Sequence, residues 1–158
     1  MDFGSKPVDG GNFFLTETER LEISKADELT HEFIRPYLNS EEFINGKLRY
    51  VFWIEDNEVE KAKRSSVISA RLEGVHKIRI ESSKVQTNSA AKWPHRFGEI
   101  RHKASQRTIV VPRVSSEKRD FLPVGLVRGG TVIGDRNFVL YDAPLWNMAL
   151  IASRLHWV

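Results

Sequence analysis

Residues 108–141 read TIVVPRVSSEKRDFLPVGLVRGGTVIGDRNFVLY, and this stretch decides the fold class. Its β-branched and aromatic residues fall into three runs, which predict strands over Thr108–Val114, Phe121–Val127 and Thr131–Tyr141. Glycine and proline separate the runs, most clearly at Gly129–Gly130. Because short connections join neighbouring antiparallel strands, the stretch predicts a mostly antiparallel sheet.

The residues on either side of this stretch extend the predicted sheet and close it. Phe97–Arg101 alternates in character and predicts a further strand. Ala143–Val158 predicts a helix that closes the sheet, with Asp142 as its N-cap and Pro144 at its first position.

The first third of the chain predicts two helices and a strand. The first helix covers Thr16–Lys25, with Thr16 or Thr18 as its cap and acidic residues near its positive end. The second covers Asp27–Leu38, where apolar residues recur at helical spacing, although Pro36 should end or bend it. Asn45–Gly46 predicts a turn that leads into a buried strand over Lys47–Ile54.

The middle of the chain predicts two further helices, over Glu58–Glu73 and Val75–Gln86, with Gly74 between them. The predicted fold class is therefore α+β, with N-terminal helices and a strand, a helical middle, and a C-terminal mostly antiparallel sheet closed by a helix. A length of 158 residues favours a single domain over 1–158.

The composition excludes several classes of protein. The chain has no cysteine, which excludes disulfides, thiolate zinc sites and cysteine nucleophiles. No apolar run approaches the ~20 residues that a membrane-spanning helix needs. The N-terminal residues lack the basic-then-apolar pattern of a signal peptide. We therefore expect a cytoplasmic protein without a membrane partner.

The net charge of +3 hides a strong asymmetry along the chain. Residues 1–62 hold 7 Lys or Arg and 14 Asp or Glu, whereas residues 84–128 hold 10 and 3. A basic middle after an acidic front indicates a surface that faces a polyanion. Solvated charges and helix ion pairs are the alternative interpretation.

The sequence holds no motif of an enzyme active site. It lacks a Gly-rich phosphate loop, a dinucleotide fingerprint and a nucleophile elbow. The five histidines show no metal-ligand spacing, so no metal site is expected. Glu99 is a possible acid, base or metal ligand, but no second carboxylate lies near it in sequence. A structural ion pair is therefore the favoured interpretation of Glu99.

Two basic segments carry the kinds of side chain that contact DNA phosphates. One follows the first predicted strand of the decisive stretch, and the other lies at the end of the second middle helix. The predicted phosphate contacts are Arg113, Ser115, Ser116, Lys118 and Arg119 in the first, and Arg79, Ser83 and Lys84 in the second. The same composition fits a polar turn with solvated charges, and a helix that packs against a neighbouring domain.

The glycine-rich loop after Val127 carries side chains that suit base edges. Arginine reads guanine, asparagine reads adenine, and aspartate accepts a hydrogen bond from cytosine. The predicted base-reading residues are Arg128, Asp135, Arg136 and Asn137. A glycine-rich hairpin also contains such residues for turn geometry alone. Among the basic residues further upstream, Trp93 is a candidate for stacking on an unpaired base or for a core anchor.

Five stretches together resemble one known family. They are FGSKPVDGGNF at 3–13, FIRPYLNSEEFINGKLRYVFWI at 33–54, FGEIRH at 97–102, IVVPRVSSEKRDFLPVG at 109–125 and VLYDAPLWNMALIASRLHWV at 139–158. The chain resembles the target-recognition region of the MmeI-like family. These type II enzymes fuse an endonuclease, an adenine DNA methyltransferase and a target-recognition domain in one polypeptide. The stretches occur in the family's order and cover nearly the whole chain.

The resemblance implies a larger parent enzyme. In the family, the methyltransferase part transfers a methyl group from S-adenosylmethionine to an adenine amine, and cleavage by the nuclease part requires Mg. The family's Asn-Pro-Pro-Tyr motif and its cofactor-binding glycine motif are absent from this sequence. The resemblance thus implies a recognition module excised from a multidomain enzyme, with no cofactor and no catalytic residue of its own. It also implies that some base contacts lie beyond the C-terminal end.

The resemblance also sorts the candidate residues. Positions shared by family members with different targets imply phosphate contacts or a role in the fold, and here they are Glu99, Arg101, Arg113, Ser115 and Ser116. Base choice is then expected where members differ, at Asp135, Arg136 and Asn137.

We therefore expect a monomeric module that docks on double-stranded DNA and positions the target adenine for the methyltransferase domain of the same polypeptide. Two alternatives remain open. One is an intramolecular docking module with little DNA contact, whose acidic first third packs on a basic neighbour. The other is a small metal-dependent nuclease that uses Glu99.

Overall fold

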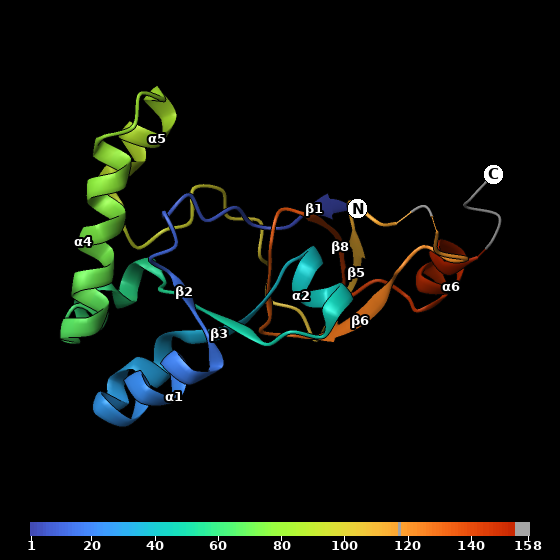
Figure 1. The fold of residues 1–158 in the computed structure, drawn as a ribbon, viewed down its shortest axis with the longest axis horizontal. Coiled ribbons are helices and arrows are strands. Elements are labelled where there is room, and N and C mark those ends of the chain that lie inside the picture. Colours follow the sequence, from blue (N-terminus) through green and yellow to red (C-terminus); the bar gives the residue numbers. More distant parts are fainter. Residues whose placement is uncertain (117, 154–158) are drawn as a thin grey trace. The chain divides into compact units, whose positions relative to one another are not determined.

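The computed structural model of the chain describes residues 1–116 and 118–153. The chain divides into two compact units, each built from separate segments (Figure 1). We call the first the sheet unit, formed by Met1–Ser5, Tyr37–Lys47 and the described residues of Arg101–Val158. We call the second the helical unit, formed by Lys6–Pro36 and Leu48–Ile100. Each unit is described by itself.

The sheet unit holds a four-stranded sheet in the order β1-β8-β5-β6. The strands are β1 (Asp2–Phe3), β5 (Arg107–Pro112), β6 (Gly125–Arg128) and β8 (Asn137–Tyr141). All three pairings are antiparallel. The α+β class and the mostly antiparallel C-terminal sheet are therefore confirmed.

One face of this sheet carries the core of the unit. The register places Thr108 opposite Val127 and Val110 opposite Val139, so their side chains share a face. Val110, Val139 and Ile133 are buried there. Partly buried side chains pack around them, from Leu38, Phe43, Val127 and Tyr141.

Three shorter elements complete the sheet unit, namely β7, α2 and α6. Strand β7 (Val132–Ile133) pairs in parallel with the last two residues of β3 (Ile34–Leu38). Helix α2 (Ser40–Asn45) ends at Gly46, which has the left-handed conformation that glycine adopts without strain. The predicted turn at Asn45–Gly46 is thus the end of a helix. Helix α6 (Trp146–Ala152) follows the sheet in the chain.

Three predictions for this part of the chain need correction. The predicted strand Thr131–Tyr141 is split into β7 and β8, because a turn at Asp135–Arg136 reverses the chain. Phe97–Arg101 is no strand and makes only a single bridge, between Lys6 and Glu99. The predicted cap of the last helix, Asp142, instead accepts hydrogen bonds from the backbone amides of residues 106 and 107.

The predicted helix over 143–158 therefore begins later than expected. Its first residue is Trp146, so Pro144 lies outside it. The described part of the helix ends at Ala152, and residues 154–158 lie outside the described range.

The helical unit begins with a turn and a short strand pair. Strand β2 (Phe14–Leu15) pairs antiparallel with β4 (Arg49–Phe52). Helix α1 (Glu17–Ala26) follows; Thr16, one of the two candidate caps, is its N-cap and forms a capping box with Glu19.

The predicted helix over 27–38 is wrong. Residues Glu28–Phe33 form the 3₁₀ helix η1, and the chain then extends into β3. Pro36 disfavours the helical conformation of the residue before it, and a proline cannot donate a helical hydrogen bond. These local restraints favour a strand at this position.

The middle helices also have different boundaries. The 3₁₀ helix η2 (Asp56–Glu58) leads into the short helix α3 (Val59–Ala62), and the long helix α4 (Ser66–Ile80) begins after a Ser65 cap. Helix α4 runs through Gly74, where a helix end was predicted. A Cβ on Gly74 would lie 2.4 Å from Oδ1 of Asn12, so the glycine allows close packing. Helix α5 (Val85–Ser89) and the 3₁₀ helix η3 (Ala90–Lys92) follow.

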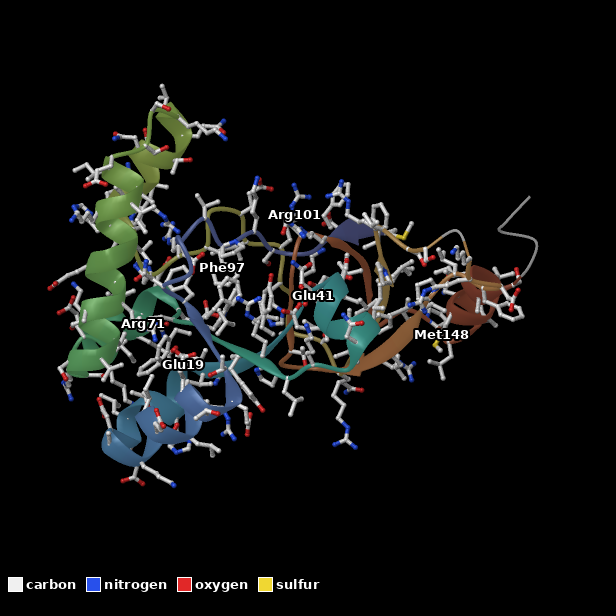
Figure 2. The ribbon with its side chains drawn as sticks, in the orientation of Figure 1. Glu19, Glu41, Arg71, Phe97, Arg101 and Met148 are labelled. Carbon is white, nitrogen blue, oxygen red and sulfur yellow. The ribbon has the colours of Figure 1, made fainter. Side chains whose placement is uncertain are left out.

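The core of the helical unit is rich in aromatic side chains. The rings of Phe13 and Phe97 are stacked at 5.3 Å between centroids. On the surface of the unit, Arg71 of α4 lies toward Glu19 of α1 at 3.6 Å (Figure 2). Among the described residues, no helix is both long and apolar enough to cross a membrane.

Candidate nucleic-acid interface

The turn between β7 and β8 is held from several sides. The backbone amide of Arg136 donates to Oδ1 of Asn39 at 3.1 Å, and the hydroxyl of Ser40 donates to the carbonyl oxygen of Arg136. Within the turn, the amide of Asn137 donates to the carbonyl of Gly134 at 3.1 Å. The backbone of the turn is therefore fixed, while the side chain of Arg136 is exposed and that of Asp135 is half-buried.

Gly134 and Asn137 shape this turn from inside the unit. A Cβ on Gly134 would lie 2.2 Å from the hydroxyl oxygen of Tyr37, so only glycine fits. The side chain of Asn137 is fully buried, and its Nδ2 donates to the carbonyl of Leu38 at 3.2 Å. The prediction that Asn137 reads a base is therefore wrong, because its side-chain amide is buried and donates to a carbonyl oxygen within the unit.

Arg113 connects the end of β5 to the same turn. Its backbone amide donates to the carbonyl of Arg136 at 2.9 Å, and its guanidinium donates to the carbonyl of Asp135 at 3.2 Å. The guanidinium also lies over the ring of Phe3, 4.9 Å from the centroid. Arg113 is exposed, so it has further donors that face solvent.

Arg101 lies on the same aromatic ring. Its guanidinium donates to Oδ1 of Asp2 at 2.8 Å and lies 5.6 Å from the centroid of the Phe3 ring. The pKa of the Asp2 carboxyl is lowered, first by the hydrogen bond from the Phe3 amide and then by Arg101. The structure thus brings Arg101 and Arg113 together around Phe3.

The loop after β5 presents most of its polar side chains to solvent. Ser116, Lys118 and Arg119 are exposed, and the amide of Lys118 donates to the Ser116 hydroxyl at 3.3 Å. Ser115 is half-buried, and its hydroxyl oxygen has no hydrogen-bond partner among the described residues. The loop therefore offers two cations and one exposed hydroxyl.

Arg128 ends strand β6 and is exposed. The register of the β5–β6 pair places it directly opposite Arg107, which is exposed as well. Sequence reasoning missed Arg107, because only the pairing register reveals its neighbour.

One predicted phosphate contact in the helical unit, Arg79, is wrong. Arg79 is fully buried, and its guanidinium donates to five carbonyl oxygens, those of Pro7, Val8, Ala90, Trp93 and Arg96, at 2.7–3.3 Å. Burial lowers the pKa of Arg79, while the charge of Asp9 opposes that shift. Because it is buried and bonded to five carbonyl oxygens, the Arg79 side chain cannot reach a phosphate.

Arg79 instead anchors the N-terminal segment. One of its acceptors belongs to Val8, whose φ of 50° is unusual for a β-branched residue. The other two predicted contacts in this unit, Ser83 and Lys84, are exposed between α4 and α5.

The basic and aromatic side chains after α5 make contacts within the helical unit. His95 is buried, and its Nε2 contacts Oδ1 of Asp56 at 2.9 Å. Arg96 forms two hydrogen bonds with the same carboxylate, which lower the pKa of Asp56 to about 2. The ring of Trp93 has Lys92 at 4.0 Å and Arg96 at 4.9 Å, so its faces already hold cations.

Glu99 sits in an extended segment whose backbone pairs with that of Lys6. The described residues contain no group of three or more His, Asp or Glu side chains arranged to hold a metal ion. Two further residues that sequence reasoning missed, Asn39 and Ser40, hold the turn through side-chain contacts across about 97 positions of sequence.

Comparison with known proteins agrees with this arrangement. The family model of the MmeI target recognition domain matches residues 1–158. DNA methyltransferase A of Bacillus subtilis (strain 168) is 37% identical over 161 residues, which cover all of this chain and 18% of that protein. The solved structure of the Type IIL restriction-modification enzyme MmeI in complex with DNA is similar with a TM-score of 0.94 and 26% identity. That match covers 98% of this chain and 21% of the other.

This chain therefore spans about a fifth of the length of these two relatives. The match of the family model over the whole chain is sufficient to assign the family. The chain belongs to the MmeI target recognition domain family.

Proposed function

We propose that this recognition domain docks on duplex DNA and reads part of its sequence for a DNA methyltransferase on the same polypeptide. The observation that carries the proposal is the turn after β7, whose fixed backbone presents the exposed Arg136 in the same unit as a cationic loop. The DNA in the solved MmeI complex supports the proposal, since that enzyme contains a region similar to this chain.

Docking on DNA would rest on contacts to phosphates. Each neutralised phosphate contributes a slope of about −0.9 to the dependence of log affinity on log salt concentration. We assign this role to exposed or half-exposed side chains of both units, namely Ser83, Lys84, Arg101, Arg113, Ser116, Lys118 and Arg119. Ser115 takes part only if its loop opens, because its hydroxyl is buried.

Base reading would fall to Asp135 and Arg136. A turn held by hydrogen bonds loses little conformational entropy when it binds, so its side chains can discriminate bases efficiently. A bidentate arginine contact with guanine contributes about 1–3 kcal/mol of discrimination against other bases. Arg128, the remaining predicted base reader, is exposed on β6 and is assigned below.

The chemistry would belong to the parent enzyme. We propose an S-adenosylmethionine-dependent adenine methyltransferase, with an endonuclease part that needs Mg. The target adenine must leave the base stack to reach such an active site. The residues of this chain would fix the register on DNA, as a cytoplasmic and monomeric module, and would break no bond.

Substitution of the turn arginine tests the proposal. Arg136→Ala should change the sequences that the chain retains from a randomised duplex pool, while total binding falls little. Arg64→Ala, an exposed arginine of the helical unit, is the matched control and should leave the retained sequences unchanged. Identical sequences retained by wild type and Arg136→Ala would refute the assignment of base reading to this turn.

A second function is favoured by helix α6. Leu145, Trp146 and Leu150 are 49%, 61% and 53% exposed, which suits packing against another part of the parent enzyme. This surface would make the domain an intramolecular docking module. Trp146→Ala should then weaken association with the separately expressed methyltransferase domain without changing DNA affinity, and unchanged association would remove this function.

A further inference from the structure

Two arginines face each other across the β5–β6 pair. The antiparallel register joins Arg107 to Arg128, and directly opposite residues place their side chains on the same face, with Cβ atoms about 4.5–5.5 Å apart. Both residues are exposed. The two arginine side chains therefore start from neighbouring positions at one end of the hairpin, from which both guanidinium groups can reach one ligand.

Within residues 1–116 and 118–153, no carboxylate forms a salt bridge with Arg107 or Arg128. The acidic side chain beside Arg107 is Asp142, and its Oδ1 accepts hydrogen bonds from the backbone amides of Gln106 and Arg107 at 2.9 and 3.1 Å. This carboxylate is thus committed to the backbone. Like charges directly opposite each other destabilise a strand pair, so the arrangement suits a protein that binds an anion there.

The end of the hairpin also leaves room for a ligand. Strand β6 is followed by Gly129 and Gly130, which carry no side chain. A Cβ added to Gly130 would meet no atom within 4 Å, whereas one added to Gly129 would lie 1.8 Å from the carbonyl oxygen of Ser105. The open space at this end of the hairpin is therefore on the Gly130 side of the turn, two residues from Arg128.

We propose that Arg107 and Arg128 together bind one phosphate of the DNA backbone. The inference rests on the proposed function, and it adds a residue, Arg107, to the interface. Guanidinium groups suit a phosphate because their planar forks make parallel hydrogen bonds to its oxygens. This assignment gives Arg128 a contact with the DNA backbone in place of base reading. Such a contact provides affinity without sequence preference.

The DNA test uses Arg107→Gln, Arg128→Gln and the double variant of the full chain, with Arg64→Gln as control. Each single variant should lose several-fold in affinity for every duplex. The double variant should flatten the salt slope by about one. Because both side chains hold one phosphate, the two single losses should not add. The sequences retained from a random pool should stay the same.

Two results would overturn the proposal that Arg107 and Arg128 bind one phosphate. If wild type binds DNA but Arg107→Gln leaves affinity and slope unchanged, the phosphate site fails while the proposed function stands. If Arg128→Gln changes the retained sequences, Arg128 reads a base instead. If wild type binds no DNA at low salt, the proposed function fails, and a second measurement decides on the pair.

That second measurement is thermal unfolding of the free chain. In low salt, Arg107→Gln should raise the melting temperature by about 1–2 °C, because it relieves the repulsion. Inorganic phosphate should then stabilise wild type more than Arg107→Gln. Equal stabilisation of the two by phosphate, with chloride at matched ionic strength as reference, would contradict the anion site.

Discussion

The guanidinium of Arg113 donates a hydrogen bond to the backbone carbonyl of Asp135 at 3.2 Å, in the turn that presents Arg136. A residue that sequence reasoning assigned to phosphates therefore also supports the predicted base reader. Under the proposed function, this one side chain would couple contact with the DNA backbone to recognition of the bases.

Substitution of Arg113 should consequently affect both affinity and selectivity. Arg113→Lys keeps the charge but loses the planar fork that reaches the Asp135 carbonyl and the Phe3 ring. We expect a loss of several-fold in affinity together with a broader set of retained sequences. Lys118→Gln, in an exposed residue whose amide contacts Ser116 of its own loop, should lower affinity for all duplexes alike. An Arg113→Lys variant with wild-type selectivity would argue against the coupling.

The packing at Gly134 predicts a loss of stability. Gly134→Ala would bring a methyl group to 2.2 Å from the hydroxyl oxygen of Tyr37, and such overpacking costs about 1–3 kcal/mol. Urea unfolding measures this change in the free energy of unfolding. Addition of Tyr37→Phe should recover part of the loss, because it removes the crowded atom. A double variant no more stable than Gly134→Ala would show that the clash lies elsewhere.

Burial of Arg79 predicts a structural role. Arg79→Met would remove five buried hydrogen bonds to carbonyl oxygens, of which those of Pro7, Ala90 and Trp93 keep a backbone donor, and we expect a loss of about 3 kcal/mol in the free energy of unfolding. Lys77→Met, on the same helix and exposed, should stay within about 0.5 kcal/mol of wild type. If urea unfolding showed the same stability for the two variants, Arg79 would not have this structural role.

The contacts of Asp56 predict a dependence of stability on pH. Hydrogen bonds from Arg96 and His95 lower the pKa of Asp56 from 3.8 to about 2. A carboxyl whose pKa is lower in the folded state stabilises the fold above its unfolded pKa, and this contribution is lost as pH falls from about 4 toward about 2. Asp56→Asn should thus be less stable than wild type at neutral pH, with the difference shrinking toward pH 2.

Thermal unfolding from pH 2 to pH 7 measures this difference. Glu73→Gln, an exposed acid of the same unit, is the control and should show no such trend. A stability gap between Asp56→Asn and wild type that stays constant across this range would contradict the pKa assigned to Asp56.

Sequence patterns predicted individual helices and strands better than the pairing between strands that lie far apart in the chain. The capping box at Thr16 and the strand at β5 follow from residues close in sequence. The parallel pair of β3 and β7 joins segments about 95 residues apart, and no local pattern encodes such a pairing. Gly74 marked a helix end by propensity, but the packing of Asn12 against it overrides that propensity.

The candidate site shows the same limit. Residue type indicated Arg136 and Asn137 equally as base readers, yet one is exposed and the other buried. Likewise Arg79 and Lys84 belong to one basic segment, and only burial separates an anchor from a surface cation. Burial and strand register are properties of the folded chain, so residue type alone cannot separate exposed candidate residues from buried ones.

The central claim is that this chain reads DNA through a fixed turn on a cationic surface. The most direct test is binding of the chain to a randomised duplex pool across a salt series, with sequencing of the retained DNA. We expect binding that weakens steeply with salt and an enriched motif that changes in Arg136→Ala. Absence of binding even at low salt would contradict it and would favour the docking function of helix α6.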